Sequence, residues 1–227
     1  MIKLDKPLAS YIDHTILKPF ATKEEILEVA KECRIHHFAM LAINSYPVSY
    51  CKEYLKDSDV HVGAAIGFPL GQSTIETKVF ETLDAIRNGA DEIDYVLNIS
   101  EVKAGNFMYI EQEMTRIVNA CRKHHKIVKV IFENAYLTKD EIITLATIAK
   151  KVKPDYIKTS TGFAPSGATI DDVKLMKKTV GSDVKVKAAG GIRDLETCLA
   201  MIEAGAQRIG TSSSLKILAA YALLESQ

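Results

Sequence analysis

Two lysines lie in apolar, strand-like segments of this sequence. Lys158 ends the run Tyr156-Ile-Lys158 and precedes Thr-Ser-Thr-Gly162, and Lys187 lies within Val184-Lys-Val-Lys187-Ala-Ala. A lysine ammonium is strongly hydrated and is almost never buried without a partner. An amine held in such a place can lose its charge and attack a carbonyl carbon. The ordinary alternative is a lysine whose stem is buried while its head reaches solvent.

The two lysines are expected to act as a pair. Lys187 follows Lys158 by one strand and stands at a similar height in that strand. Two neighbouring ammoniums disfavour each other's charge, so the pKa of at least one should fall, and the two should titrate as a unit. The nearby Lys185 is expected to face outward, away from the pair.

A carboxylate is placed in a similar apolar segment. Asp94 lies in Asp91-Glu-Ile-Asp94-Tyr-Val-Leu97. A buried carboxylate needs a cation, and an inward Lys187 would serve. Such an acid could move the proton that imine chemistry requires. The alternative is a structural ion pair that makes buried lysines tolerable.

Glycine and serine follow two of the late strands. Ala189-Gly190-Gly191-Ile-Arg193 and Gly210-Thr-Ser212-Ser213 both come directly after apolar runs. Glycine lets backbone N–H groups approach an anion, and a helix N-terminus favours negative charge. The two segments together predict a phosphate site.

These residues need a scaffold, and the sequence alternates short apolar strands with amphipathic helices about eight times. The predicted strands are Tyr11–His14, Phe38–Ile43, His61–Ile66, Glu92–Leu97, Ile127–Phe132, Tyr156–Thr159, Val184–Ala188 and Arg208–Gly210. Continuously apolar strands alternating with helices indicate a parallel sheet covered on both faces. The length fits one (β/α)8 TIM barrel over residues 1–227, with a short extra N-terminal helix from Leu8. An open doubly wound sheet is the alternative, but no Gly-x-Gly-x-x-Gly follows the first strand.

Three of the helices begin with capping-box patterns. The predicted boxes are Thr22–Glu25, Ser73–Glu76 and Thr138–Glu141. In each of them a hydroxyl residue precedes an acid by three positions, which satisfies two N–H groups at the start of a helix.

Composition excludes several classes of function. The chain has 29 basic and 29 acidic residues, so nothing indicates a nucleic-acid or membrane-surface patch. No apolar run approaches the length of a membrane span, and Met1–Lys6 lacks the apolar region of a secretory signal. Four dispersed cysteines fall in helical segments and are expected to be buried thiols, which favours a cytoplasmic protein.

Six segments spread over nearly the whole chain resemble the deoxyribose-phosphate aldolase family. They are Asp13-His-Thr-Ile-Leu-Lys18, Ile66-Gly-Phe-Pro-Leu-Gly71, Gly89-Ala-Asp-Glu-Ile-Asp94, Ile157-Lys-Thr-Ser-Thr-Gly-Phe163, Val186-Lys-Ala-Ala-Gly-Gly-Ile-Arg193 and Ile209-Gly-Thr-Ser-Ser213. The resemblance implies a class I aldolase on a (β/α)8 barrel that needs neither metal nor organic cofactor. It also implies reversible cleavage of 2-deoxy-D-ribose 5-phosphate to acetaldehyde and D-glyceraldehyde 3-phosphate, in deoxyribonucleotide catabolism.

The resemblance assigns roles to individual residues. Lys158 matches the lysine that forms the Schiff base, Lys187 the lysine that perturbs it, and Asp94 the partner in proton transfer. The phosphate-binding residues implied are Gly190, Gly191, Ser212 and Ser213. Further substrate contacts are expected from Asp13, Thr161 and Gly162, and a homo-oligomer, dimer or tetramer, is expected.

Three departures from the family pattern bear on the pocket, and one of them is Asn44-Ser-Tyr-Pro47, where members carry Asn-Pro. Ala42 stands where members often carry cysteine, and Asn134 follows Glu133 where threonine is common. Two other readings of the sequence stay open: a different phosphate-binding barrel enzyme, such as an isomerase or another Schiff-base aldolase, and a barrel that only binds a sugar phosphate.

Overall fold

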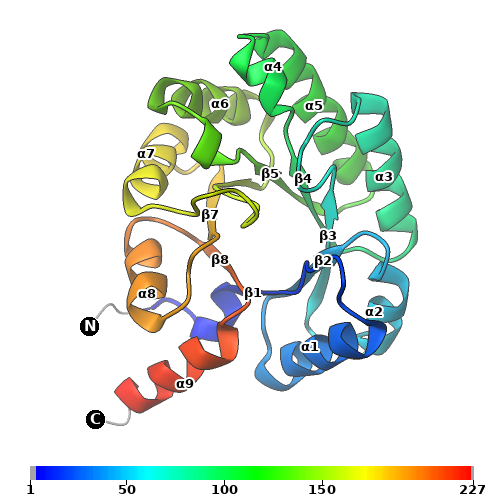
Figure 1. The fold of residues 1–227 in the computed structure, drawn as a ribbon, viewed down its shortest axis with the longest axis vertical. Coiled ribbons are helices and arrows are strands. Elements are labelled where there is room, and N and C mark those ends of the chain that lie inside the picture. The colour runs from blue at the N-terminus through cyan, green and yellow to red at the C-terminus, as the bar shows by residue number, and fades with distance from the viewer. Residues whose placement is uncertain (1–3, 226–227) are drawn as a thin grey trace.

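The computed structural model describes residues 4–225, in which eight parallel strands close into a barrel in sequence order (Figure 1). The strands are β1 (Ile12–Thr15), β2 (Met40–Asn44), β3 (His61–Ile66), β4 (Glu92–Val96), β5 (Ile127–Ile131), β6 (Tyr156–Lys158), β7 (Lys185–Ala189) and β8 (Arg208–Thr211). Because β8 pairs with β1, the predicted (β/α)8 barrel is confirmed and the open sheet is excluded.

Helices surround the strands as a ring (Figure 1). They are α1 (Lys23–His36), α2 (Val48–Tyr54), α3 (Ile75–Arg87), α4 (Ile99–Lys103), α5 (Phe107–Lys123), α6 (Lys139–Val152), α7 (Ile170–Val180), α8 (Leu195–Glu203) and α9 (Ser214–Glu225), with short 3-10 helices η1 (Leu8–Tyr11) and η2 (Asn134–Tyr136). The expected N-terminal helix is η1. The sequence pattern missed α4, which is a five-residue helix and too short to show a helical period.

Two of the three predicted capping boxes are confirmed. The side chains of Thr22 and Thr138 accept hydrogen bonds from Glu25 N–H and Glu141 N–H, and both glutamates return the bond to the cap. The third prediction was one residue early. Thr74 caps α3 by accepting from Thr77 N–H, so the helix begins one residue later than the Ser73–Glu76 pattern suggested.

The barrel gives its strands an apolar outer face, and six of them (β1 and β4 to β8) carry charged side chains on the inner face, whereas β2 and β3 present Met40, Ala42, Gly63 and Ala65 there. Ile157 and Val186 are fully buried on the side of the helices, between residues that point inward. The prediction that Lys185 faces away from Lys187 is wrong, because residues two apart in a strand lie on the same face. Its amine lies 5.4 Å from the ring centre of Tyr156, on the same face as Lys187 but at the N-terminal end of the barrel, where it is exposed.

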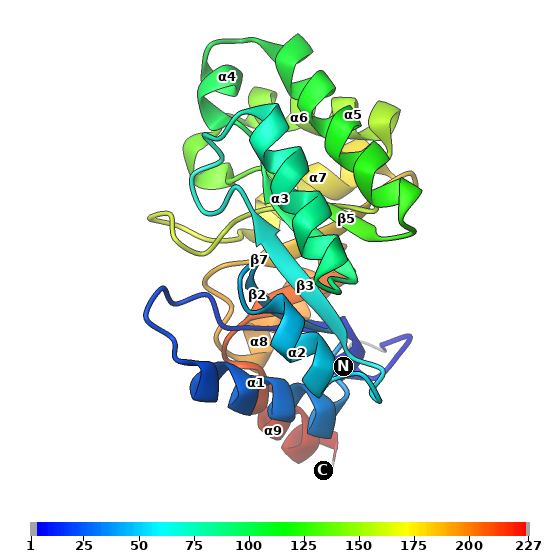
Figure 2. The same cartoon turned by 90° about the vertical axis from the view of Figure 1, so that its right-hand side faces the viewer.

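The two ends of the barrel differ. Figure 2 shows the loops that follow β1 (dark blue) and β6 (yellow) projecting from the same side of the molecule. This is the side where the strands end, and in parallel barrels the loops after the strands build the functional site. The predicted residues that follow β6, β7 and β8 therefore converge at this end.

Candidate active site

The structure brings Lys158, Lys187 and Asp94 together inside the barrel. Lys158 and Lys187 are direct partners across β6 and β7. Both amines contact the same carboxylate oxygen, Asp94 Oδ2, at 2.9 Å from Lys158 Nζ and 2.7 Å from Lys187 Nζ. The two nitrogens are therefore separated by no more than the sum of these distances. All three side chains are buried.

Burial is the largest cause that lowers the pKa of Lys158 to about 8. The Asp94 carboxylate opposes this shift, and the Lys187 ammonium adds to it. The sequence prediction assigned the shift to the neighbouring lysine, whereas desolvation is the stronger effect. Three lysines in turn hold the pKa of Asp94 well below its usual range, with Lys129 the strongest of them, although burial alone would raise it.

Lys129 is a third interior lysine that the sequence analysis missed. Its amine contacts Asp94 Oδ1 at 2.7 Å and also pairs with Glu92. Lys129 lies in Ile127-Val-Lys129-Val-Ile131, a charged residue in an apolar strand. That is the same signal that drew attention to Lys158, so the sequence did contain it.

Below these groups, ion pairs continue toward the floor of the barrel. Arg208 donates to Asp13 Oδ1 at 2.6 Å and to Glu92 Oε1 at 3.1 Å, and Asp13 Oδ2 lies 2.5 Å from Lys187 Nζ. Asp13, an expected substrate contact, is thus fully buried among cations: Arg208 and Lys187 contact it, and Lys129 Nζ lies 4.0 Å from its Oδ2. Its carboxylate contacts the Lys187 amine from the side that faces away from the cavity.

The charges of this interior cluster balance when one lysine is neutral. Among the described side chains, Asp13, Glu92 and Asp94 meet Arg208 and the lysines at positions 129, 158 and 187 through the contacts given above. Three carboxylates therefore face four cationic groups, and the half-exposed His61 also contacts Glu92, with its Nδ1 2.7 Å from Oε1. A buried surplus charge is costly, so the proton is most easily lost from the cation with the lowest pKa. Lys158 has a pKa lowered to about 8, and its side chain also borders the open cavity described next.

A cavity of approximately 440 Å³ opens above the lysines. Its lining includes Lys158 and Lys187, the predicted residues Thr161, Gly162, Gly190, Gly191 and Ser212, and also Arg193. Of the departures from the family pattern, Ala42 borders this cavity and residues 44–47 do not, whereas Asn134 is buried elsewhere and donates to Met176 Sδ at 3.4 Å. Only Ala42 can therefore alter the shape of the pocket directly.

The two loops after β7 and β8 have the geometry expected of an anion site. Gly190 has φ 82°, and a Cβ there would lie 3.0 Å from the Cα of Gly167, so a side chain would be both strained and crowded. Ser213 is not part of the cavity lining, and its N–H donates to Thr211 Oγ1 at 2.9 Å. Helix α9 begins at the next residue, so the loop leads into a helix N-terminus.

Glu133 orients the loop after β6. It adopts the left-handed conformation (φ 59°), and its carboxylate accepts from Thr161 N–H at 3.1 Å and from the Thr161 hydroxyl. Burial raises the pKa of Glu133. The predicted substrate contacts Thr161 and Gly162 are thus held against the wall of the cavity by an acid at the end of β5.

Within residues 4–225, no group of three or more histidine, cysteine, aspartate or glutamate side chains is arranged to hold a metal ion. In the same part of the chain, none of the helices combines the length and the apolar character needed to cross a bilayer.

Fold and site together define a (β/α)8 barrel with an amine of lowered pKa beneath an open cavity lined by glycine-rich loops. Residues 8–220 match the model of the DeoC/LacD family aldolases, and the chain belongs to that family. It is an aldolase of this class, with the fold that the resemblance implied.

Named relatives align with almost the whole chain. A deoxyribose-phosphate aldolase of Lactobacillus acidophilus is 59% identical over 92% of this chain and 88% of its own. One from Caldanaerobacter subterraneus subsp. tengcongensis is 51% identical over 96% of both chains.

Solved structures of aldolases have the same fold as this chain. An aldolase designated QR15 has 38% sequence identity and a TM-score of 0.91, with 96% of this chain and 97% of that chain covered. A tetrameric deoxyribose phosphate aldolase of Aeropyrum pernix has 30% identity and a TM-score of 0.88, covering 96% and 92%.

Proposed function

We propose that this chain is a deoxyribose-phosphate aldolase that works through a Schiff base on Lys158. One observation carries the proposal: a buried lysine of lowered pKa borders the cavity and shares a carboxylate oxygen with a second lysine. An amine near its pKa at neutral pH supplies the uncharged form that adds to an aldehyde. The names of the relatives support the substrate.

The first step joins the amine to the sugar. Lys158 Nζ attacks C1 of the open-chain aldehyde, and loss of water gives a protonated imine. The imine then accepts the electron pair of the C2–C3 bond as that bond breaks. The C3 hydroxyl loses its proton and becomes the aldehyde of glyceraldehyde 3-phosphate, while C1 and C2 stay on the lysine as an enamine.

The second half returns the enzyme to its starting state. A proton is added to C2 of the enamine, and water hydrolyses the resulting imine to acetaldehyde and the free lysine. We assign these proton transfers to Asp94 and Lys187, acting with water, because both contact the Lys158 amine or its carboxylate partner. The reverse sequence forms the carbon–carbon bond.

The phosphate end of the substrate is assigned to the loops after β7 and β8. Gly190, Gly191 and Ser212 border the cavity on one side, and Ser213 leads into α9. Glycine backbone and a helix N-terminus both favour an anion. Binding the phosphate there fixes which end of the sugar lies over Lys158.

Reductive trapping tests the assignment. Borohydride added during turnover with 2-deoxyribose 5-phosphate should reduce the imine, and mass spectrometry should locate the adduct on the peptide that carries Lys158. Lys158→Leu should show neither adduct nor cleavage, while Lys185→Leu, which changes a lysine at the far end of the barrel, should keep both. An adduct on another lysine would reject the mechanism.

The same experiment separates the two alternatives. A barrel that only binds sugar phosphates would be stabilised by ligand without turnover or adduct, and its lysine pair would have no use. A different Schiff-base aldolase would give an adduct with another sugar phosphate and not with this one. Cleavage assays across several sugar phosphates distinguish these cases.

We also propose that residues 1–227 form one domain, that the chain assembles into a homo-oligomer and that it works in the cytoplasm in the breakdown of deoxyribose phosphates. The tetrameric relative supports assembly. Cys33, Cys51, Cys121 and Cys198 are free and buried, as expected where thiols are kept reduced.

A further inference from the structure

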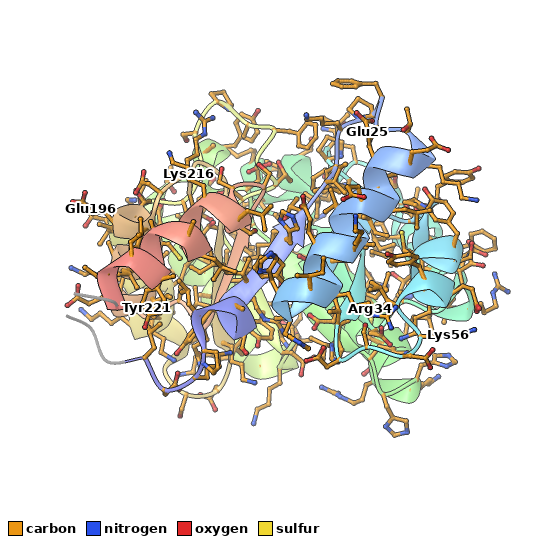
Figure 3. The ribbon with its side chains drawn as sticks, turned by 90° about the horizontal axis from the view of Figure 1, so that it is seen from below. Glu25, Arg34, Lys56, Glu196, Lys216 and Tyr221 are labelled. Atoms are coloured by element: carbon orange, nitrogen blue, oxygen red, sulfur yellow. The ribbon has the colours of Figure 1, made fainter. Side chains whose placement is uncertain are left out.

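His14 is a buried histidine that the mechanism above does not use. It lies on β1, between α1 and α9; Figure 3 shows this strand between α1, which carries Glu25 and Arg34, and α9, which carries Lys216 and Tyr221. Its Nε2 is 2.7 Å from Glu32 Oε2 on α1, and its Nδ1 is 2.8 Å from Ser214 Oγ on α9. Both ring nitrogens are therefore engaged, and the ring packs against Phe38.

The contact with Ser214 fixes the start of the helix that follows the proposed phosphate loop. Ser214 is the first residue of α9, directly after Ser212 and Ser213. His14 is also the strand partner of Thr211, whose hydroxyl donates to Ile192 O at 2.6 Å and accepts from Ser213 N–H at 2.9 Å. The loops after β7 and β8 are thus tied to each other by Thr211 and to β1 by His14.

The order serine, histidine, acid is that of a hydrolase triad, but this chain of contacts cannot act as one. Ser214 is fully buried and is not part of the cavity lining. Its hydroxyl also lies 3.3 Å from Thr211 O. The serine has no path to a substrate, so its role is to anchor the helix.

The contact with Glu32 gives His14 a second role, which is to hold this carboxylate in place. Glu32 borders the cavity, and 28% of its side chain is exposed. A free carboxylate at the rim of an anion site repels phosphate. The contact with His14 holds the acid against β1 and offers it a donor.

We propose that His14 is a positioning residue that sets the affinity of the loops after β7 and β8 for the phosphate group of the substrate. The inference deepens the proposed function and rests on it for the identity of the substrate. His14 touches the cavity wall but acts through Ser214 and Glu32. Its loss should weaken binding of the phosphate end and leave chemistry at Lys158 in place.

The test compares a phosphorylated and a non-phosphorylated substrate. In His14→Phe and Ser214→Ala, KM for 2-deoxyribose 5-phosphate should rise by about threefold to tenfold, because both variants lose the hydrogen bond between these side chains and His14→Phe also loses the contact with Glu32. The specificity constant kcat/KM for 2-deoxyribose should stay close to that of the wild type. Glu32→Gln keeps an acceptor for His14 and removes the charge, so its KM for the phosphorylated sugar should not rise. Ser58→Ala removes a hydroxyl that donates to Leu55 O at the opposite end of the barrel and serves as control.

Calorimetry with inorganic phosphate separates this inference from the proposed function. If the wild type binds phosphate and Ser214→Ala binds it more weakly, the inference holds even when no aldolase turnover is found. Unchanged phosphate affinity in both His14→Phe and Ser214→Ala would overturn it. Equal loss of activity toward both sugars would also overturn it, because that is the result of general damage to the fold.

Discussion

At the scale of single residues, the reactivity of Lys158 depends on its pKa, which is set by desolvation and by two neighbours of opposite charge. Burial and Lys187 lower the pKa of its amine, and Asp94 raises it. Lys187 acts on this pKa in two ways. Its ammonium directly disfavours the charged form of Lys158, and its ion pair with Asp94 neutralises the carboxylate that favours that form. The outcome is a pKa of about 8, close enough to neutrality for a useful fraction of free amine.

This balance predicts opposite effects of two substitutions. The uncharged amine is the nucleophile, so kcat/KM should rise with pH until it levels off above about 8. Lys187→Met removes a cation and should move this rise to higher pH, whereas Asp94→Asn removes an anion and should move it to lower pH, although both lower the maximum rate. The measurement is the pH dependence of kcat/KM. Shifts in the same direction would contradict the account.

At the scale of elements, a buried ion pair fixes the end of β4 beside the site. Lys78 of α3 donates to Glu113 Oε1 of α5 at 2.6 Å and to Val96 O at 2.8 Å, and Glu113 accepts from Asn98 N–H at 3.0 Å. Neither charged side chain has any exposed surface. The pair thus joins α3 and α5 to the last residue of β4, Val96, and Asp94 lies two residues before it on the same strand.

Breaking this pair should be costly, and removing it entirely much less so. Lys78→Met leaves the acid buried and unpaired, so the free energy of unfolding should fall by about 3–5 kcal/mol. In Lys78→Met with Glu113→Leu, most of that loss should be recovered, because neither charge remains to be desolvated. Urea unfolding of both variants gives the comparison. Equal stability of the single and double variants would contradict this account, because the loss in Lys78→Met would then not come from the acid left unpaired.

At the scale of the whole molecule, closure of the barrel unites residues from opposite ends of the chain. Arg208 and Asp13 are 195 residues apart, yet their ion pair helps to place Lys187. Several large apolar side chains face outward, among them Phe20, Tyr46, Phe80 and Met108, each more than half exposed. Single exposed apolar residues are normal, and only where such residues are contiguous do they mark a surface that associates.

The proposed assembly is testable by mass. Light scattering coupled to size exclusion should give a dimer or tetramer of the 25.0 kDa chain, as the tetrameric relative suggests. Substituting Met108 or Phe80 by lysine should shift the mass toward the monomer if its helix lies in the contact. A wild-type mass of 25.0 kDa at micromolar concentration would refute the assembly.

Local patterns in the sequence were enough to determine the order of the strands, the parallel barrel and the inward placement of Lys158, Lys187 and Asp94. These depend on short-range regularities, namely strand alternation, helix caps and the length of connections, which are written in consecutive residues. A charged residue inside an apolar strand is a local signal as well. Lys129 carried that signal and was overlooked, while the inner side of Lys185 was missed through an error of strand period.

Tertiary structure alone decided which charges meet. Nothing in the sequence near Asp13 says that its partners are Arg208 and Lys187, and nothing near His14 points to Ser214. These contacts exist because the last strand closes on the first. The pKa of Lys158 likewise depends on how deeply the closed barrel excludes water, since desolvation, the largest cause of its shift, is a property of the folded molecule and not of any segment.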